Sequence, residues 1–134
     1  MIYPIVNLKR QRHDRKPQEI RGYIRALEQV IIKTLSTYKI EAFGKTQPTS
    51  ENSLQDTGVW VKEKKIASIG IAVRGWVSFH GAAINVENDI MAFQGLNPCG
   101  YKSSVMTNLE ILSQQKIDLN EFKDNLKKNC LELL

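Results

Sequence analysis

The sequence contains few cysteines, few histidines and no long apolar run, and each shortage excludes a class of protein. Its two cysteines, Cys99 and Cys130, do not form a CxxC pair, so a disulfide scaffold or a cysteine-ligated metal is not expected. His13 and His80 are its only histidines and no HExxH motif occurs, so no protein-built metal site is predicted. No stretch reaches the roughly 18 uninterrupted apolar residues of a membrane span, and no membrane association is expected.

The first residues also lack the pattern of an export signal. MIYPIVNLKRQR places basic residues after a short apolar run, which is the reverse order of a secretory signal. Together with two free thiols, this pattern predicts a cytoplasmic protein. The 134 residues, 42% of them hydrophobic and 25% charged, suffice for one globular domain, which we predict to span residues 1–134.

Positive charge is concentrated in the first quarter of the sequence. The net charge of the chain is +5. Residues 1–33 hold eight lysines and arginines against three acidic residues, so this segment accounts for the whole excess. An acidic protein partner, a nucleic acid or merely a solvated basic loop would each fit such a run. Nucleic acid fits least, because aromatic residues are not interleaved with the basic ones.

Two helices are predicted, one toward each end. Pro17 is a favourable first helical residue, and the apolar residues after it recur at spacings of three and four. The spacing predicts an amphipathic helix of about five turns with arginines on its outer face. Its apolar face is expected to comprise Ile20, Ile24, Leu27, Ile31 and Leu35. A second helix is predicted after Asp118, which forms a capping-box-like pair with Glu121, while Ile117 and Phe122 are spaced as a hydrophobic staple.

The segments between the helices read as sheet strands. Residues 38–43, 59–61, 65–73 and 76–86 are predicted strands, and their short connections favour antiparallel pairing. Residues 2–8 contain Pro4 and are restricted to a sheet edge or end. Residues 44–58 and 88–100 are predicted loops. The expected fold class is therefore α+β, with a mixed, mostly antiparallel sheet packed against helices.

Three residues have chemistry that a site could use. Cys99 lies in NPCG, His80 in FHG, and Lys65 opens an apolar strand. A nearby ammonium stabilises a thiolate and lowers the pKa of the thiol, and the N–H of Gly100 could face an oxyanion, so the set suits acyl transfer. Each residue also has a structural interpretation: a turn cysteine, a hydrogen-bonded histidine and a solvated strand end. Spacing alone favours the structural interpretation of each residue.

The order of several segments is more specific than any one motif. GVWV (58–61), KIASIGIAVRGWVSFHGAAINV (65–86) and NPCG (97–100) follow YPIVNLKR (3–10) and YIRALE (23–28). In this combination they resemble the lipoyl(octanoyl) transferase family over nearly the whole chain. The resemblance implies a fold similar to the biotin and lipoate protein ligases.

The resemblance also implies an enzyme and its site. The reaction would be an octanoyltransferase step of lipoate biosynthesis and protein lipoylation. It moves an octanoyl group from octanoyl-acyl carrier protein to a lysine of lipoyl domains, such as those of 2-oxoacid dehydrogenase complexes. Cys99 would be the acyl-thioester nucleophile, Lys65 would lower its pKa, and His80 would orient groups around the site. The family's substrate-binding positions fall on Ser68, Ile69, Gly70, Gly81, Ala82 and Ala83. The two acyl exchanges need no metal and no dissociable cofactor.

One part of the family pattern is not found in this sequence. Family members carry a region with an RGG…HGPGQ motif upstream of the YPI segment, where it forms part of the acyl pocket. We therefore expect the chain to correspond to the C-terminal part of an octanoyltransferase domain. Whether the missing region is encoded upstream, supplied by a second polypeptide or lost stays open, and without it an exposed sheet edge and an apolar patch are expected. The alternative function is a module that binds carrier protein or lipoyl domains without turnover.

Overall fold

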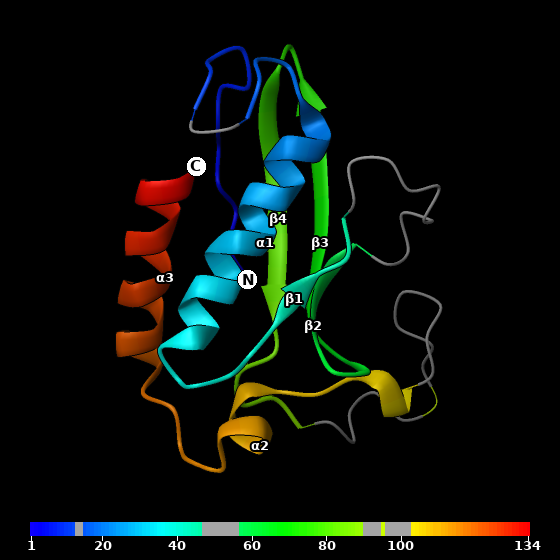
Figure 1. Ribbon diagram of the computed structural model, residues 1–134, viewed down its shortest axis with the longest axis vertical. Helices are drawn as coiled ribbons and strands as arrows, with labels where there is room; N and C mark the ends of the chain where they lie inside the picture. Colours follow the sequence, from blue (N-terminus) through cyan, green and yellow to red (C-terminus); the bar gives the residue numbers. More distant parts are fainter. Residues whose placement is uncertain (13–14, 47–56, 90–94, 96–102) are drawn as a thin grey trace.

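The structure is a computed structural model, and it describes residues 1–12, 15–46, 57–89, 95 and 103–134. In chain order its elements are α1 (Ile20–Ser36), β1 (Phe43–Gly44), β2 (Gly58–Val61), β3 (Lys64–Arg74), β4 (Val77–Ile84), the 3-10 turn η4 (Ser103–Val105), α2 (Leu109–Ser113) and α3 (Leu119–Leu133). The strands form one antiparallel sheet in the order β1-β2-β3-β4. Figure 1 shows α1 running along the sheet with α3 beside it. The expected α+β class is confirmed.

Helix α1 follows the predicted spacing but starts later than Pro17. Gln18 has a φ of 60°, in the left-handed region, so the helix cannot extend back through it. Glu19 is the N-cap, and Ile24, Leu27 and Leu35 are buried as predicted. The placement of Ile20 on the apolar face is wrong: Ile20 is 41% exposed, although Tyr23 of the same turn is buried in the core.

Residues 2–8 extend the sheet along β4 as an edge segment. Ile2 and Ala82 exchange both backbone hydrogen bonds, at 2.9 and 3.0 Å. Farther along, the N–H of Ser78 donates to the carbonyl of Val6, and that of Leu8 to the carbonyl of Trp76. The edge position predicted from Pro4 is therefore confirmed.

The strand predicted at 38–43 is wrong except at its last residue. The backbone N–H groups of Tyr38 and Ile40 donate to the carbonyl of Leu35, and Lys39 has a φ of 60°. These residues therefore complete the end of α1, and only Phe43–Gly44 pairs with β2. Apolar side chains in this segment, such as Ile40, pack against the core from a turn rather than from a strand.

Helix α3 begins where the capping signal predicts. The Asp118 carboxylate accepts hydrogen bonds from the N–H groups of Asn120 and Glu121, at 2.8 and 3.3 Å. Ile117 and Phe122, the predicted staple pair, are both buried in the core. These interactions fix the start of the helix, and Figure 1 shows α3 packed beside α1.

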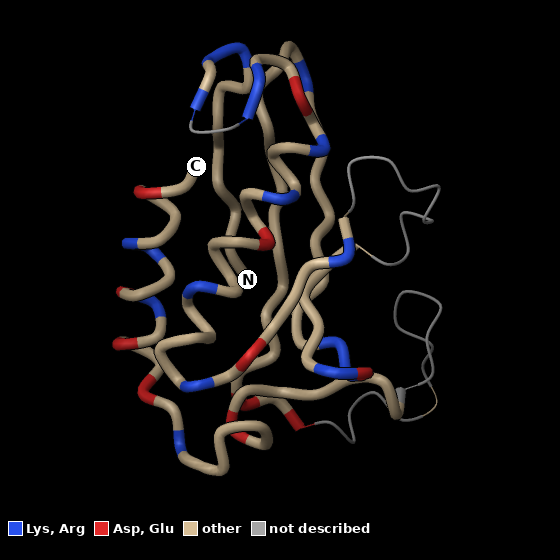
Figure 2. Tube along the Cα trace, in the orientation of Figure 1, with Lys and Arg blue, Asp and Glu red and all other residues tan. Residues whose placement is uncertain are grey.

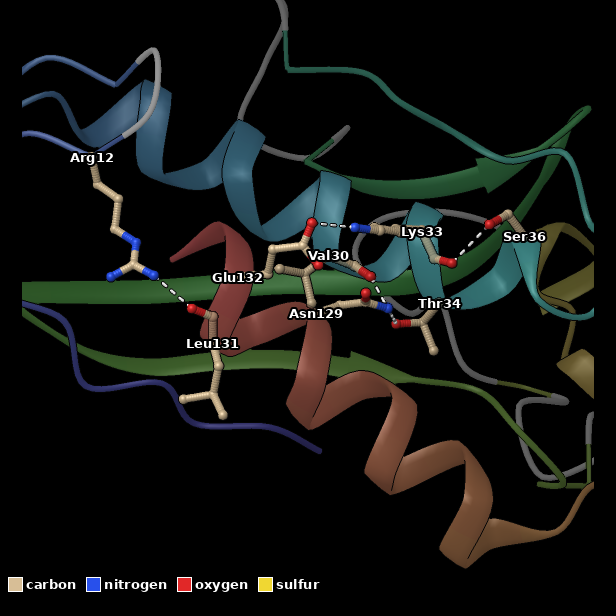
Figure 3. Close-up of polar contacts among 8 residues, drawn as sticks. All are labelled: Arg12, Val30, Lys33, Thr34, Ser36, Asn129, Leu131 and Glu132. Carbon is tan, nitrogen blue, oxygen red and sulfur yellow. Dashed lines mark hydrogen bonds and ion pairs between the residues drawn. The ribbon is translucent and has the colours of Figure 1, made fainter.

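Polar side chains also join α3 to α1 (Figure 3). The amide of Asn129 donates to the Thr34 hydroxyl at 2.9 Å, and that hydroxyl donates to the carbonyl of Val30 at 2.8 Å. Both side chains are buried, whereas the ion pair between Lys33 and Glu132 is about half exposed, at 46% and 50%. Among these contacts, the buried pair therefore carries more of the interaction between the helices.

Candidate functional site

The sheet has one face covered by helices and one face that exposes apolar side chains. Side chains alternate between the faces along each strand, and the pairing of β3 with β4 identifies which residues share a face. Ala67, Ile69 and Ala82 belong to the covered face and pack in or against the core. We call the other side the open face. It comprises Ser68, Gly70, Ala72 and Arg74 of β3, Val77, Phe79, Gly81 and Ala83 of β4, and Tyr3 and Ile5 of the edge segment.

Large apolar side chains are exposed on the open face, as the sequence predicts. Tyr3 is 58% exposed, Ile5 78%, Val77 38% and Phe79 40%. They lie on the edge segment and on β4, where Asn7 pairs with Val77 and Ile2 with Ala82. An apolar group gathered on one sheet face marks a surface suited to an apolar ligand or a packing partner.

The predicted substrate-binding residues divide between the two faces. Ser68 pairs with Ala83, and Gly70 pairs with Gly81, so these residues form a strip of small side chains on the open face. Ile69 and Ala82 also pair with each other, but their side chains face the helices. Only the backbone of these two residues is therefore available to a ligand on the open face.

A β-bulge turns Lys65 toward the same face. The register between β2 and β3 shifts between Val59 and Trp60, so that Val59 pairs with Ala67 but Trp60 pairs with Lys65. Val59 belongs to the core, and Trp60, the next residue, points to the opposite side. Without the bulge, the alternation from Ala67 would direct Lys65 into the core. A single extra residue in a strand is a common means of re-aiming a side chain at a functional site.

Lys65 is not a solvated strand end. The residue is 1% exposed, and its Nζ lies 5.5 Å from the centroid of the Trp60 ring. The Nζ of Lys45 lies 3.6 Å from the centroid of the same ring, so two ammonium groups meet one indole. A charge buried in this way is costly unless its surroundings stabilise it, which makes Lys65 a candidate for chemistry.

The backbone around Lys65 is fixed by a segment that the sequence did not point to. The N–H of Thr107 donates to the carbonyl of Lys65 at 3.1 Å, next to a parallel bridge between Lys65 and Met106. The Asn85 amide donates to the carbonyl of Thr107, and the Asn85 N–H donates to the carbonyl of Ile66. Neither Asn85 nor Thr107 stood out, because isolated polar residues near strand ends carry no distinctive spacing.

The two strand glycines have different surroundings. A Cβ added to Gly81 would overlap the carbonyl oxygen of Ile2, so the chain's own edge segment explains this glycine. A Cβ added to Gly70 would have no described atom within 4 Å. Of these two glycines, only Gly81 is closely approached by another part of the described chain. Gly70 leaves an unfilled position in the strip.

His80 does not fit the structural interpretation, and its orienting role stays a prediction. Its side chain is exposed, its φ is 64°, and its ring lies 5.0 Å from that of Phe79. The expected hydrogen-bonded structural histidine is not seen, since its side chain makes no hydrogen bond within the described ranges. His80 pairs with Ile71, six positions along β3 from Lys65, which corresponds to about 20 Å of extended strand.

A buried acid lies beneath the segment that carries Lys45. Glu28 of α1 is 3% exposed and accepts hydrogen bonds from the N–H and the hydroxyl of Thr46, at 3.2 and 2.8 Å. Burial raises the pKa of Glu28, and the hydrogen bonds from Thr46 oppose that effect. A Cβ at Gly44 would overlap this carboxylate, so the glycine allows β1 to lie against Glu28.

The basic segment lies beside the end of the sheet where β3 turns into β4, and lysines and arginines gather near that end in Figure 2. Asn7 bridges to Val77, which pairs with Arg74 at the far end of β3. The nine positions from Lys65 to Arg74 correspond to about 30 Å of extended strand. We call this end the basic pole; its exposed cations are Lys9, Arg10, Arg12, Lys16, Arg21 and Arg74.

Some of the predicted features lie outside the described residues. Cys99 and the rest of NPCG lie outside the described ranges, and so does most of the loop predicted at 88–100. In the part of the chain that is described, no group of three His, Cys, Asp or Glu residues could hold a metal ion. No described helix is long and apolar enough to cross a membrane.

Comparison with known proteins identifies the family. The profile described as "Lipoyl protein ligase A/B catalytic domain" matches residues 1–131. The chain is 46% identical to an octanoyltransferase of Bdellovibrio bacteriovorus, covering 100% of this chain and 63% of that protein. It is 36% identical to an octanoyltransferase of Orientia tsutsugamushi, covering 99% of this chain and 61% of that protein. The chain thus spans less than two thirds of the length of these relatives.

Solved structures agree on the fold. A lipoate-protein ligase A bound with ATP aligns with a TM-score of 0.67 at 19% identity, over 86% of this chain and 46% of that chain. A biotin protein ligase from Aquifex aeolicus, in complex with biotin and ATP, aligns with a TM-score of 0.68 at 15% identity, over 98% of this chain and 48% of that chain. Fold, motif order and family profile agree: this chain belongs to the lipoyl protein ligase A/B catalytic domain family.

Proposed function

We propose that the chain is the cysteine-bearing part of an octanoyltransferase in protein lipoylation. Its relatives of 46% and 36% identity are named octanoyltransferases. The observation that carries the proposal is the buried ammonium of Lys65, which a bulge directs to the same sheet face as the strip of Ser68, Gly70 and Ala83. This arrangement offers a cation for a nucleophile and room for an acyl chain along the sheet.

The proposed reaction consists of two acyl exchanges on Cys99. The thiolate attacks the thioester of octanoyl-acyl carrier protein, and the carrier thiol leaves with a proton. A lysine amine of a lipoyl domain then attacks the octanoyl-cysteine thioester, forming the amide and returning the thiol. Lys65 would favour the thiolate by its positive charge, and the backbone N–H of Gly100 is the proposed donor to the oxyanion in each exchange.

The proposed partners are acidic proteins, and the basic pole supports this part of the proposal. Carrier proteins and lipoyl domains are characteristically acidic, so a positively charged end would speed their encounter with the chain. Because the basic pole lies about 30 Å from Lys65 by strand length, a partner docked there must reach along the sheet to the site. The pole therefore steers a partner and takes no part in the chemistry.

Intact-mass analysis tests the proposal. The 134-residue chain is incubated with octanoyl-acyl carrier protein, and an octanoyl adduct is expected in the unchanged protein and absent from Cys99→Ser. Cys130→Ser is the matched control and should keep the adduct. If the unchanged protein binds the carrier but forms no adduct, the chain is a binding module and the proposed enzyme is contradicted.

A further inference from the structure

We infer that Trp60 is the positioning residue for Lys65: its indole holds the buried ammonium at the open face in the charged form. Lys65 Nζ is within cation-π range of the ring, at 5.5 Å from the centroid. The two residues are direct partners across the bulge, so the backbone itself sets their relative position. The role of Lys65 in activating a thiol rests on the proposed function. The contact between Lys65 and Trp60 does not depend on it.

Gly58 supplies the space that this arrangement needs. It pairs with Ser68, one position past the bulge, and a Cβ there would lie 2.9 Å from the Cε of Lys65 and would overlap the carbonyl oxygen of Ala67. Its φ of 148° is also one that favours glycine. The stem of Lys65 therefore runs across the backbone of Gly58, toward the Trp60 ring. Residues 58–60 and 65–68 together position the Lys65 side chain, and we call these residues the lysine holder.

The energetic reason for an aromatic partner lies in burial. Removing an ammonium from water disfavours its charged form, and the face of an indole compensates part of that cost. Trp60 is itself only 2% exposed, so its contact with the cation is shielded from water. A lysine that is to stabilise a neighbouring thiolate must stay protonated, and a neutral amine could not perform that role.

Other charged groups around Lys65 also influence whether its amine is protonated. Lys45 lies over the same ring, at 3.6 Å, and its like charge opposes protonation of Lys65. Lys64 directs its ammonium to the carbonyl of Ser104. No titratable residue occurs in Gly58–Val61, in η4 or in residues 106 and 107. Glu28 is the acid beneath the Lys45 segment, whereas Cys99 and Lys102 lie outside the described ranges.

The test is an NMR titration of the Lys65 ammonium in the full chain with 13C-labelled lysine, assigned by difference from Lys65→Met. Trp60→Leu is expected to lower the titration midpoint of Lys65 by about one pH unit, from the usual strength of a shielded cation-π contact. Trp60→Phe should lower it by less. A packing role alone gives the opposite sign, because opening the site to water favours the ammonium.

The matched control is Trp76→Leu, which removes the other tryptophan, at the far end of β3, and should leave the midpoint unchanged. Lys45→Met should raise the midpoint slightly, since a like charge is removed. An unchanged or raised midpoint in Trp60→Leu overturns the inference. If Trp60→Leu does not fold, the single variants Trp60→Phe and Lys45→Met take its place. An unchanged Lys65 midpoint in both of them overturns the inference.

A kinetic arm separates this inference from the proposed function. If Lys65→Met alters the pH dependence of octanoyl adduct formation and folded Trp60→Leu does not, the positioning role is wrong while the enzyme stands. If adduct formation is absent altogether but the Lys65 midpoint falls in Trp60→Leu, the lysine holder stands and the proposed reaction fails.

Discussion

At the scale of single residues, the two strand glycines show how similar sequence signals have different causes. Both interrupt an apolar strand, and the family resemblance places both among the substrate-binding positions. Gly81 is explained by the edge segment, whose Ile2 carbonyl occupies the place of a side chain. Gly70 has no such neighbour among the described residues and is the better candidate for contact with an acyl chain.

This difference predicts opposite effects of substitution. Gly70→Ala should keep stability or raise it by about 0.5–1 kcal/mol, because alanine loses less backbone entropy in a strand. Gly81→Ala should lose roughly 1–3 kcal/mol, because the edge segment must move. Thermal unfolding of both variants measures the contrast. In the adduct assay, Gly70→Leu should slow octanoylation several-fold while remaining folded, and an unaffected rate would remove Gly70 from the proposed acyl site.

Glu28 predicts a pH dependence of stability. Burial raises the pKa of Glu28 in the folded protein above its unfolded value of about 4.3. The folded state then binds more protons than the unfolded state between the two values, so its stability falls as pH rises through that window. Urea midpoints from pH 4 to pH 7 should fall less in Glu28→Gln than in the unchanged protein. Glu41→Gln, at an exposed acid, is the control, and equal slopes in all three proteins would contradict the assignment.

At the scale of elements, apolar patterning predicts the helices and strands that pack around the core. It does not predict the register in which β2 and β3 pair. Helices α1 and α3 follow from apolar spacing, because each buries one face, whereas strands β2 to β4 follow from short apolar runs between polar or glycine breaks, and β2 is buried at all four positions. The bulge at Val59 and Trp60 has no signature in KIASIG, since one extra residue leaves the apolar run intact. It nevertheless determines where Lys65 points, and so the partnership with Trp60 could not be predicted.

The strand prediction for residues 38–43 is wrong for a related reason. Its alternating apolar residues fit a strand, but Tyr38 and Ile40 hydrogen-bond back to Leu35. The end of α1 satisfies these backbone groups locally, and only Phe43 and Gly44 reach β2. Local hydrogen bonding at a helix end therefore outweighed strand propensity.

The contact between α1 and α3 predicts unequal losses for buried and exposed polar pairs. Asn129→Ala removes a buried amide that bonds to Thr34, and a loss of about 1–3 kcal/mol in the free energy of unfolding is expected. Glu132→Ala removes a half-exposed partner of Lys33 and should cost less than about 0.5 kcal/mol. Chemical denaturation of both variants compares them directly. Equal losses would show that the buried pair is not the main polar link between the helices.

At the scale of the whole molecule, charge and site are separated along the sheet. The sequence predicted a basic segment and an acidic partner, but it gave no information on which end of the sheet carries the charge. Antiparallel pairing of residues 2–8 with β4 carries the basic pole to the Arg74 end of β3. The order of the motifs was sufficient to identify the family, because the ordered set is specific even though each single motif is ambiguous.

The basic pole predicts salt-dependent association. Lys9→Glu combined with Arg10→Glu should slow the association of an acidic carrier protein several-fold at low salt, and the difference should fade as salt screens it. Lys127→Glu combined with Lys128→Glu, on α3, changes the net charge equally and should have a smaller effect. Stopped-flow association rates at two salt concentrations measure both. Equal rates for the two double variants would show that net charge matters and the pole does not.

We propose above all that Lys65, on the open face of the sheet, activates the thiol of Cys99. The most direct measurement is the rate of octanoyl adduct formation from pH 6 to pH 10, in the unchanged chain and in Lys65→Ala, from intact mass over time. Without the ammonium, the pKa of the thiol returns toward about 8.5, so the variant should be slowest relative to the unchanged protein near neutral pH and approach it at high pH. A ratio of the two rates that stays constant across the pH range would contradict the claim.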